Sequence, residues 1–188
     1  MICNYRRFKG MGVYRTLLIA ACLALFNVVA AAGDDAPVAA ADPAAGNVPI
    51  TVTKRENIRV VYEIKTDDWS AGIGRGLYYV RGLLEAYKSQ GVDLQQLHIS
   101  VVLHGKPVSW LLSGDAWQDY KSDPFANNPN EHVIEGLLAH GVSIEACNVT
   151  MEAEGWSAED LLPGVKVVHD GYTRLIDLQQ RGYAYIRF

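Results

Sequence analysis

Five short apolar runs, rich in β-branched residues, recur along the chain, and stretches with helical periodicity separate them. Runs that are apolar almost without interruption indicate strands covered on both faces, as in a parallel sheet. Strands that alternate with helices need crossover connections, so the pattern predicts a doubly wound α/β domain. The five runs span residues 58–64, 97–103, 142–146, 165–168 and 183–187.

Start and stop signals mark the helices between these runs. Glycine commonly follows the last turn of a helix, and it does so here at positions 91, 141 and 182. Asn128-Pro129-Asn130-Glu131 is typical of a helix start with Asn128 as N-cap, Ser157 to Asp160 forms a capping box, and Asp170 caps the last helix. The expected order is β-α-β-α-α-β-α-β-α-β. We therefore predict a flavodoxin-like three-layer fold with a mainly parallel five-stranded sheet in the strand order 2-1-3-4-5.

The amino terminus has the layout of a secretory leader. Arg6, Arg7, Lys9 and Arg15 form a cationic region, and an apolar stretch over 16–32 ends in small residues that suit a signal peptidase. We predict a signal peptide over 1–32, export to the bacterial periplasm, and no membrane span after cleavage. A permanent membrane anchor, a lipoprotein box at 19–22 and a twin-arginine signal are the alternatives.

The next segment, 33–57, is rich in Ala and Pro and lacks periodicity, so it predicts a disordered arm before a single domain at 58–188. Without the leader the chain keeps 13 basic and 21 acidic residues, a net charge of −8. An acidic protein of this kind is a poor partner for nucleic acid and for anionic membranes.

Cleavage of the leader also removes Cys3 and Cys22 and leaves Cys147 as the one cysteine. An intramolecular disulfide and a cysteine-based zinc cluster are then impossible. A single cysteine in an oxidising compartment indicates a reactive thiol or an intermolecular bridge. The alternative is a buried cysteine that serves as a small hydrophobic residue.

Polar and reactive side chains follow two of the predicted strands. Cys147 comes directly after the third strand, with Asn148 and Thr150 beside it, and His104-Gly105 closes the second strand. Backbone N–H groups at such a strand end can stabilise a thiolate or a persulfide. In the expected strand order two inter-strand steps separate His104 from Cys147, about 10 Å. His104 could tune the thiol from there, or it could simply bond a backbone carbonyl.

Other motifs point to no cofactor and no metal. The glycines of 72–76 sit where a dinucleotide fingerprint would, but Leu77 occupies the place of the third glycine, so close helix packing is the competing explanation. The remaining histidines lack the spacing of metal ligands. The tryptophans are expected in the core or at an interface.

Several of these segments together resemble the DsrE/DsrF-like family. The resemblance covers nearly all of 58–188, and it rests on His104-Gly105, on 128–131, on the segment G-V-x-I-x-x-C-x-x-T over 141–150, and on the tail segments 161–165, 171, 178–179 and 182–186. It implies a compact α/β fold that forms homo-oligomers, often built on trimers. It also implies that Cys147 occupies the position of the family cysteine, which in the sulfur-relay members carries sulfane sulfur as a persulfide.

The residues and the resemblance lead to two hypotheses of function. The first is a periplasmic sulfur-handling protein, in which Cys147 accepts or transfers sulfane sulfur and His104, Gly105, Asn148 and Thr150 shape its pocket. Its partners would be a protein that donates sulfur or one that accepts it, and as an enzyme it would be sulfurtransferase-like. The alternative is a non-catalytic oligomeric module that binds a small ligand or serves assembly, with Cys147 as a structural residue.

Overall fold

The computed structural model describes residues 48–188, and its compact unit spans Pro49–Phe188. This unit includes the segment 49–57, which contacts α1 and the turn after it: the amide of Val52 and the guanidinium of Arg55 both bond Gln90. The predicted signal peptide and the first part of the predicted arm lie outside the described residues. Within 48–188, no helix combines the length and the apolar composition needed to cross a bilayer.

The elements alternate as the sequence predicted, with short additions. In the described part of the chain the strands are β1 (Ile58–Ile64), β2 (Trp69–Ser70), β3 (Ile73–Gly74), β4 (Leu97–Leu103), β5 (Ser143–Cys147), β6 (Lys166–Val168) and β7 (Ala184–Arg187). The α-helices are α1 (Arg75–Ser89), α2 (Gly114–Lys121), α3 (Glu131–Ala139), α4 (Asn148–Glu154) and α5 (Gly171–Gln180). Single-turn or short 3-10 helices are η1 (Leu94–Gln96), η2 (Lys106–Leu111) and η3 (Ala158–Asp160).

The five longer strands form one parallel sheet in the order β6-β5-β4-β1-β7. The predicted α/β class with a five-stranded parallel sheet is confirmed, but the predicted strand order is wrong. In that prediction β1 lay between β4 and β5, whereas here β4 pairs directly with β5 and β1 lies between β4 and β7. Each of the first three crossovers steps to the next position in the same direction, and only the last one returns across the sheet.

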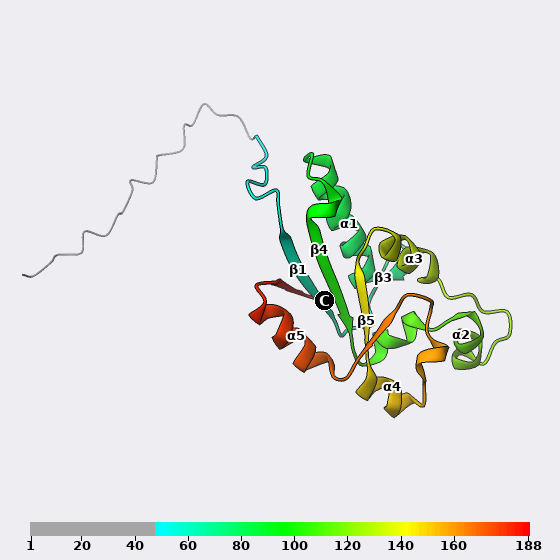
Figure 1. The fold of residues 1–188 in the computed structure, drawn as a ribbon. Helices are drawn as coiled ribbons and strands as arrows, with labels where there is room; N and C mark the ends of the chain where they lie inside the picture. Colours follow the sequence, from blue (N-terminus) through cyan, green and yellow to red (C-terminus); the bar gives the residue numbers. More distant parts are fainter. Residues whose placement is uncertain (1–47) are drawn as a thin grey trace, which may run out of the picture. The chain divides into compact units, whose positions relative to one another are not determined.

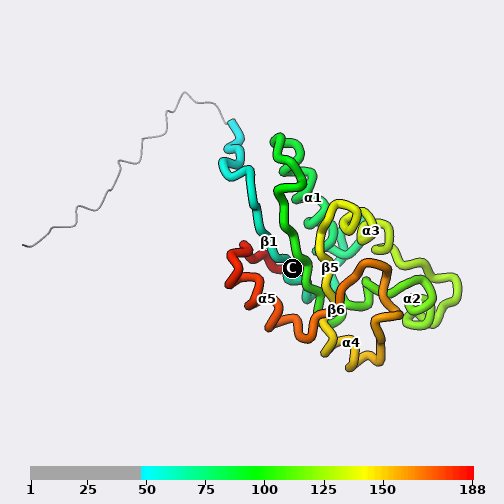
Figure 2. Tube along the Cα trace, viewed as in Figure 1, coloured from blue at the N-terminus to red at the C-terminus, as the bar shows by residue number. Residues whose placement is uncertain are grey.

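The direction of the crossovers decides which face each helix covers. Right-handed connections that advance in one direction place their helices on the same face, and a connection that returns places its helix on the other. Accordingly α1 and α3 pack together on one face, while α5 lies alone against the opposite face (Figure 1). Figure 2 shows β6 as the short outer strand beside β5. Among residues 48–188, α5 is therefore the single helix that covers this face.

The two faces of the sheet differ in chemistry. The face under α1 and α3 is apolar and carries the main core, including Val60, Tyr62, Val101 and Ile144. Alternation along the paired strands places Glu63, His104, Glu145 and Cys147 on the α5 face. The apolar cluster there is small and consists of Val61, Val102, Leu175 and Leu178. The fold thus gathers its buried glutamates and His104 beneath α5.

Close packing explains the glycines before and within α1. A Cβ on Gly74 would lie 2.3 Å from the ring of Trp110, and one on Gly76 would lie 2.5 Å from Ile64. These distances are too short for any side chain, so the backbone must approach the core here. Packing, the competing explanation for this glycine-rich segment, therefore accounts for both positions.

Two local differences bear on the site. The chain forms α4 directly after Cys147, where the sequence predicted no helix. The helix was missed because the segment 148–154 is short and carries no start signal. The third helix begins at Glu131 with Asn130 as N-cap, rather than at Asn128. The side chain of Asn128 instead donates to the carbonyls of Trp110 and Leu112, which ties η2 to the start of α3. The predicted capping box at Ser157 and the cap at Asp170 are confirmed.

Candidate functional site

Cys147 is the last residue of β5 and the N-cap of α4, and it is the one free cysteine among residues 48–188. Only 4% of it is exposed. Its Sγ accepts a hydrogen bond of 3.3 Å from the backbone N–H of Gly171, the first residue of α5. A donor at the amino end of a ten-residue helix stabilises negative charge on the sulfur, because the helix dipole adds to the hydrogen bond.

His104 stands beside this thiol. The β4–β5 register pairs Leu103 with Ala146, so the next residues, His104 and Cys147, face each other one inter-strand step apart, about 4.8 Å. The expected separation of about 10 Å was wrong because β4 and β5 are neighbours. Gly171 lies close to both side chains: its N–H binds Sγ, and a Cβ on it would lie 3.3–3.4 Å from three atoms of His104.

A buried carboxylate holds the histidine ring. Nε2 of His104 lies 2.7 Å from Oε1 of Glu63, and Glu63 is 4% exposed. The hydroxyl of Tyr185 donates to Oε2 of the same carboxylate, and Nε of Arg187 lies 3.7 Å from it. This carboxylate therefore joins His104 on one side to Tyr185 and Arg187 on the other.

The pKa values of this cluster fix where its protons reside. Burial opposes ionisation of Glu63, but the hydrogen bonds of Tyr185 and His104, electrostatic attraction by His104 and the charge of Arg187 outweigh it, so the pKa of Glu63 lies below its ordinary value. Burial, the hydrogen bond to Glu63 and repulsion by its charge raise the pKa of Tyr185 to about 12. Glu63 is therefore ionised at neutral pH, and the hydrogen of the 2.7 Å contact is carried by His104 Nε2.

We expect Glu63 to make the stability of the domain depend on acid. In the unfolded chain the pKa of this carboxyl is near its ordinary value of 4.5, and in the folded state the carboxyl stays ionised to lower pH. Its stabilising contribution is therefore complete above that value and is lost as the pH falls through the folded pKa. Urea unfolding between about pH 3 and about pH 7 should show a shallower acid slope in Glu63→Gln than in the parent. The exposed variant Glu135→Gln is the control, and equal slopes in all three proteins would contradict the assignment.

The other predicted site residues, Gly105, Asn148 and Thr150, lie near Cys147 but form hydrogen bonds with other groups. The N–H of Gly105 donates to Oγ1 of Thr150 at 3.0 Å, which ties the end of β4 to α4. Gly105 has φ of +66°, a conformation that favours glycine. Asn148 donates instead to Glu152 at 2.7 Å along α4. The structure thus brings His104, Gly105 and Thr150 to the end of β5, whereas the amide of Asn148 is engaged within α4.

A buried ion pair attaches α5 to the sheet. Nε and one terminal nitrogen of Arg174 bind the two oxygens of Glu145 at 2.7 and 2.9 Å, and Glu145 is 1% exposed. The hydrogen bond to Glu145, together with the charges of Glu145 and Asp177, holds the pKa of Arg174 above its ordinary value against the effect of burial. Glu145 lies two residues before Cys147 on the same face of β5. This pair therefore helps to hold the start of α5 over the thiol.

Sequence reasoning missed four residues of this site: Glu63, Gly171, Arg174 and Tyr185. One signal was available, because an acidic residue inside an apolar strand, as in Tyr62-Glu63-Ile64, needs a buried partner. The partners themselves come from distant segments. Among residues 48–188, no group of three His, Cys, Asp or Glu side chains is arranged to hold a metal ion.

Several solved structures match this chain, and two of them show the shared fold. A protein of unknown function from Methanobacterium thermoautotrophicum, MTH1491, is 28% identical, with a TM-score of 0.50, over 70% of this chain and 99% of that one. The YchN protein from E. coli is 17% identical, with a TM-score of 0.53, over 70% of this chain and 99% of that one. No curated protein matches the chain at a significant level.

The family comparison covers the same part of the molecule. The model of the DsrE/DsrF-like family matches residues 76–188, which is more than half of the sequence and contains β4, β5, α5, His104 and Cys147. This match agrees with the resemblance of the segments around His104 and Cys147 and with the two structural neighbours. The chain therefore belongs to the DsrE/DsrF-like family.

Proposed function

We propose that this protein is a sulfur carrier in which Cys147 accepts sulfane sulfur as a persulfide and passes it to an acceptor. Membership in the DsrE/DsrF-like family suggests a sulfur-related role. The observation that carries the finer proposal is the hydrogen bond from Gly171 N–H to Cys147 Sγ beside the Glu63–His104 pair. A charged sulfur atom gains from such a donor, and so does a persulfide anion that extends from it.

The proposed step transfers one sulfur atom without net oxidation. His104 accepts the thiol proton, and the Cys147 thiolate attacks the outer sulfur of a donor persulfide. The S–S bond of the donor breaks, a new S–S bond forms at Cys147, and the donor leaves as a thiolate with the electron pair. Glu63 keeps Nε2 of His104 protonated, so the other ring nitrogen is the one free to take the proton.

Intact-mass spectrometry tests this proposal. The purified protein is measured before and after incubation with inorganic polysulfide, which supplies sulfane sulfur. We expect a gain of about one sulfur atom per chain in the parent and no gain in Cys147→Ser. A reducing agent should reverse the gain, which distinguishes a persulfide from oxidation by oxygen. An unmodified mass in a parent protein whose thiol still reacts with an alkylating reagent would remove the carrier role.

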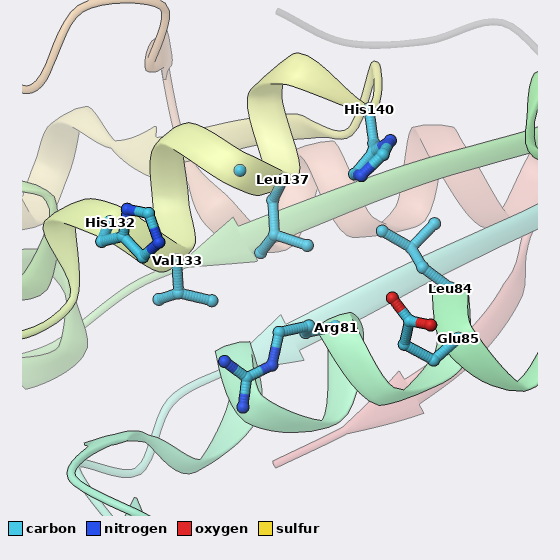
Figure 3. A pocket seen from close by; sticks show the side chains of 8 residues that line it. Arg81, Leu84, Glu85, His132, Val133, Leu137 and His140 are labelled. Carbon is cyan, nitrogen blue, oxygen red and sulfur yellow. The ribbon is translucent and has the colours of Figure 1, made fainter.

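The second candidate function is a non-catalytic module that binds a small ligand, and the burial of Cys147 favours it. A hollow of about 160 Å³ lies between α1 and α3, on the side of the sheet away from the thiol. Its floor is apolar, with Val133 and Leu137 pointing from α3 toward α1 (Figure 3). His132 of α3 and His140, the residue that caps the end of α3, also line it. Such a floor with polar groups at the rim suits a small ligand.

The rate of alkylation separates the two functions. A structural cysteine should react slowly with iodoacetamide, with little change across pH, and at full rate only after unfolding. A carrier should react in the folded state with a rate that changes with pH in the parent and differently in His104→Ala. Folded and unfolded rates that differ by several orders of magnitude at every pH would favour the binding module.

Assembly and location complete the proposal. We propose that the protein forms a homo-oligomer, as its membership in the DsrE/DsrF-like family suggests. Light scattering of the purified protein tests for a trimer-based assembly. We also propose that it works in the periplasm with a sulfur-donating or sulfur-accepting protein, and cell fractionation tests the location.

A further inference from the structure

A second hollow lies on the α5 face, between α5 and the ends of β1 and β7. Its volume is about 290 Å³, and Leu175 and Ile176 of α5 contribute apolar wall. Lys65, directly after β1, and Arg187, at the end of β7, bring two cations to it. The hollow lies at the point where the strand order reverses. From β1 the chain continues to β4 on one side, and the last strand, β7, pairs with β1 on the other side. Ligands of open α/β sheets gather at such reversals.

The charges of this hollow favour an anion. Among the described residues that line it, Glu63 is the one carboxylate, and it is already engaged by His104 through one oxygen and by Tyr185 and Arg187 through the other. Arg187 is 59% exposed, so its guanidinium is open to a ligand on the solvent side. Residues 48–188 carry 13 basic and 18 acidic side chains, so the domain as a whole is acidic. The hollow differs from it, because two cations there surround one carboxylate that already has its partners.

The remaining polar groups add donors. The ammonium of Lys65 donates to the hydroxyl of Tyr172 at 3.0 Å, so this hydroxyl keeps its own hydrogen for another acceptor. The planar guanidinium of Arg187 suits oxygens held in a fixed spacing. Two cations and a hydroxyl that converge on a small space match the oxygens of a compact oxyanion.

We propose that this hollow binds a small sulfur oxyanion, thiosulfate or sulfite, through Lys65 and Arg187. The inference rests on the proposed sulfur-carrier function and names its substrate class. Tyr172 links the hollow to the thiol, since its ring lies 4.8 Å from the ring of His104 and it follows Gly171, whose N–H binds Cys147. The oxyanion site and the sulfur atom are thus on the two sides of the first turn of α5.

The chemistry of thiosulfate fits this arrangement. The Cys147 thiolate attacks the outer sulfur of thiosulfate, the S–S bond of thiosulfate breaks, and sulfite leaves with the electron pair. The outer sulfur remains on Cys147 as a persulfide, and no external oxidant or reductant is needed. Lys65 and Arg187 attract the thiosulfate dianion to this face of the sheet before the step and the sulfite dianion after it.

Calorimetric titration of the full-length protein with thiosulfate and with sulfite tests the binding site. We expect saturable binding of both, and binding about tenfold weaker or more in the double variant Lys65→Gln, Arg187→Gln. The control is Lys54→Gln, Lys88→Gln, which removes the same charge from exposed positions. Circular dichroism checks that each variant is folded. No binding to the parent, or equal weakening in both double variants, would overturn the inference.

A comparison of two sulfur donors separates this inference from the proposed function. Polysulfide has no oxyanion group, so the variant of Lys65 and Arg187 should accept sulfur from it as the parent does. From thiosulfate the same variant should accept sulfur about tenfold more slowly. Equal loss with both donors would contradict the oxyanion site. If Cys147 takes sulfur from neither donor, the carrier function fails, while calorimetry with Cys147→Ser still decides whether the hollow binds the anion.

Discussion

Replacement of Arg174 by alanine is expected to destabilise the domain by about 3–5 kcal/mol, the cost of leaving a buried charge without its partner. Glu145 is 1% exposed, and both of its oxygens are bound by Arg174. Without the guanidinium, the carboxylate must either stay charged in a place closed to water or take up a proton. Urea unfolding at neutral pH measures the loss in the free energy of unfolding. Because the Arg174–Glu145 ion pair joins α5 to β5, we expect the whole domain to be destabilised.

A matched variant identifies the cause. Glu145→Gln, Arg174→Met removes both charges and keeps similar volumes, so we expect it to recover much of the lost stability, because a buried pair can often be replaced by uncharged residues at little cost. Arg181→Ala removes an exposed arginine near the end of the same helix and should change stability by less than about 1 kcal/mol. A loss in Arg174→Ala no larger than in Arg181→Ala would show that the ion pair does not hold α5.

The second large effect is expected for His104. In His104→Ala the second-order rate of sulfur uptake by Cys147 should fall about 100-fold or more at neutral pH, the usual contribution of a general base. The rate in this variant should also climb with pH, since hydroxide must then remove the thiol proton. The measurement is a time course of intact mass with polysulfide at several pH values.

Glu63 provides the control for this effect. If Glu63 acts only by holding the ring of His104, Glu63→Gln should cause a smaller loss, and His104→Ala, Glu63→Gln should be no slower than His104→Ala alone. A second, independent loss in the double variant would show that the two residues do not act as a unit. An unchanged rate and pH profile in His104→Ala would remove His104 from the mechanism.

Local patterns predicted most of the fold because they depend on neighbours in the sequence. The runs at Ile58–Ile64 and Leu97–Leu103 become β1 and β4 with the same bounds, and the caps at Ser157 and Asp170 form as expected. The strand order is different in kind. Right-handed crossovers are compatible with several orders, and the periodicity of a strand does not say which strand lies beside it.

The candidate site shows the same division. The sequence identified Cys147 and His104 because both end a strand, but their proximity depends on the pairing of β4 with β5. The group that binds the sulfur, the N–H of Gly171, belongs to the backbone and leaves no trace in residue type. Glu63 was visible as a charge within an apolar strand, whereas its contact with Tyr185 joins segments at opposite ends of the domain.

The central claim is that the folded site, and not merely the presence of a thiol, favours sulfur on Cys147. The most direct test is the equilibrium constant for sulfur exchange between glutathione persulfide and Cys147, measured by mass spectrometry in the folded protein and in the urea-unfolded chain. Because the Gly171 N–H bonds a charged sulfur, the account predicts a constant about tenfold or more in favour of the folded protein. Equal constants, or a constant that favours the unfolded chain, would contradict it.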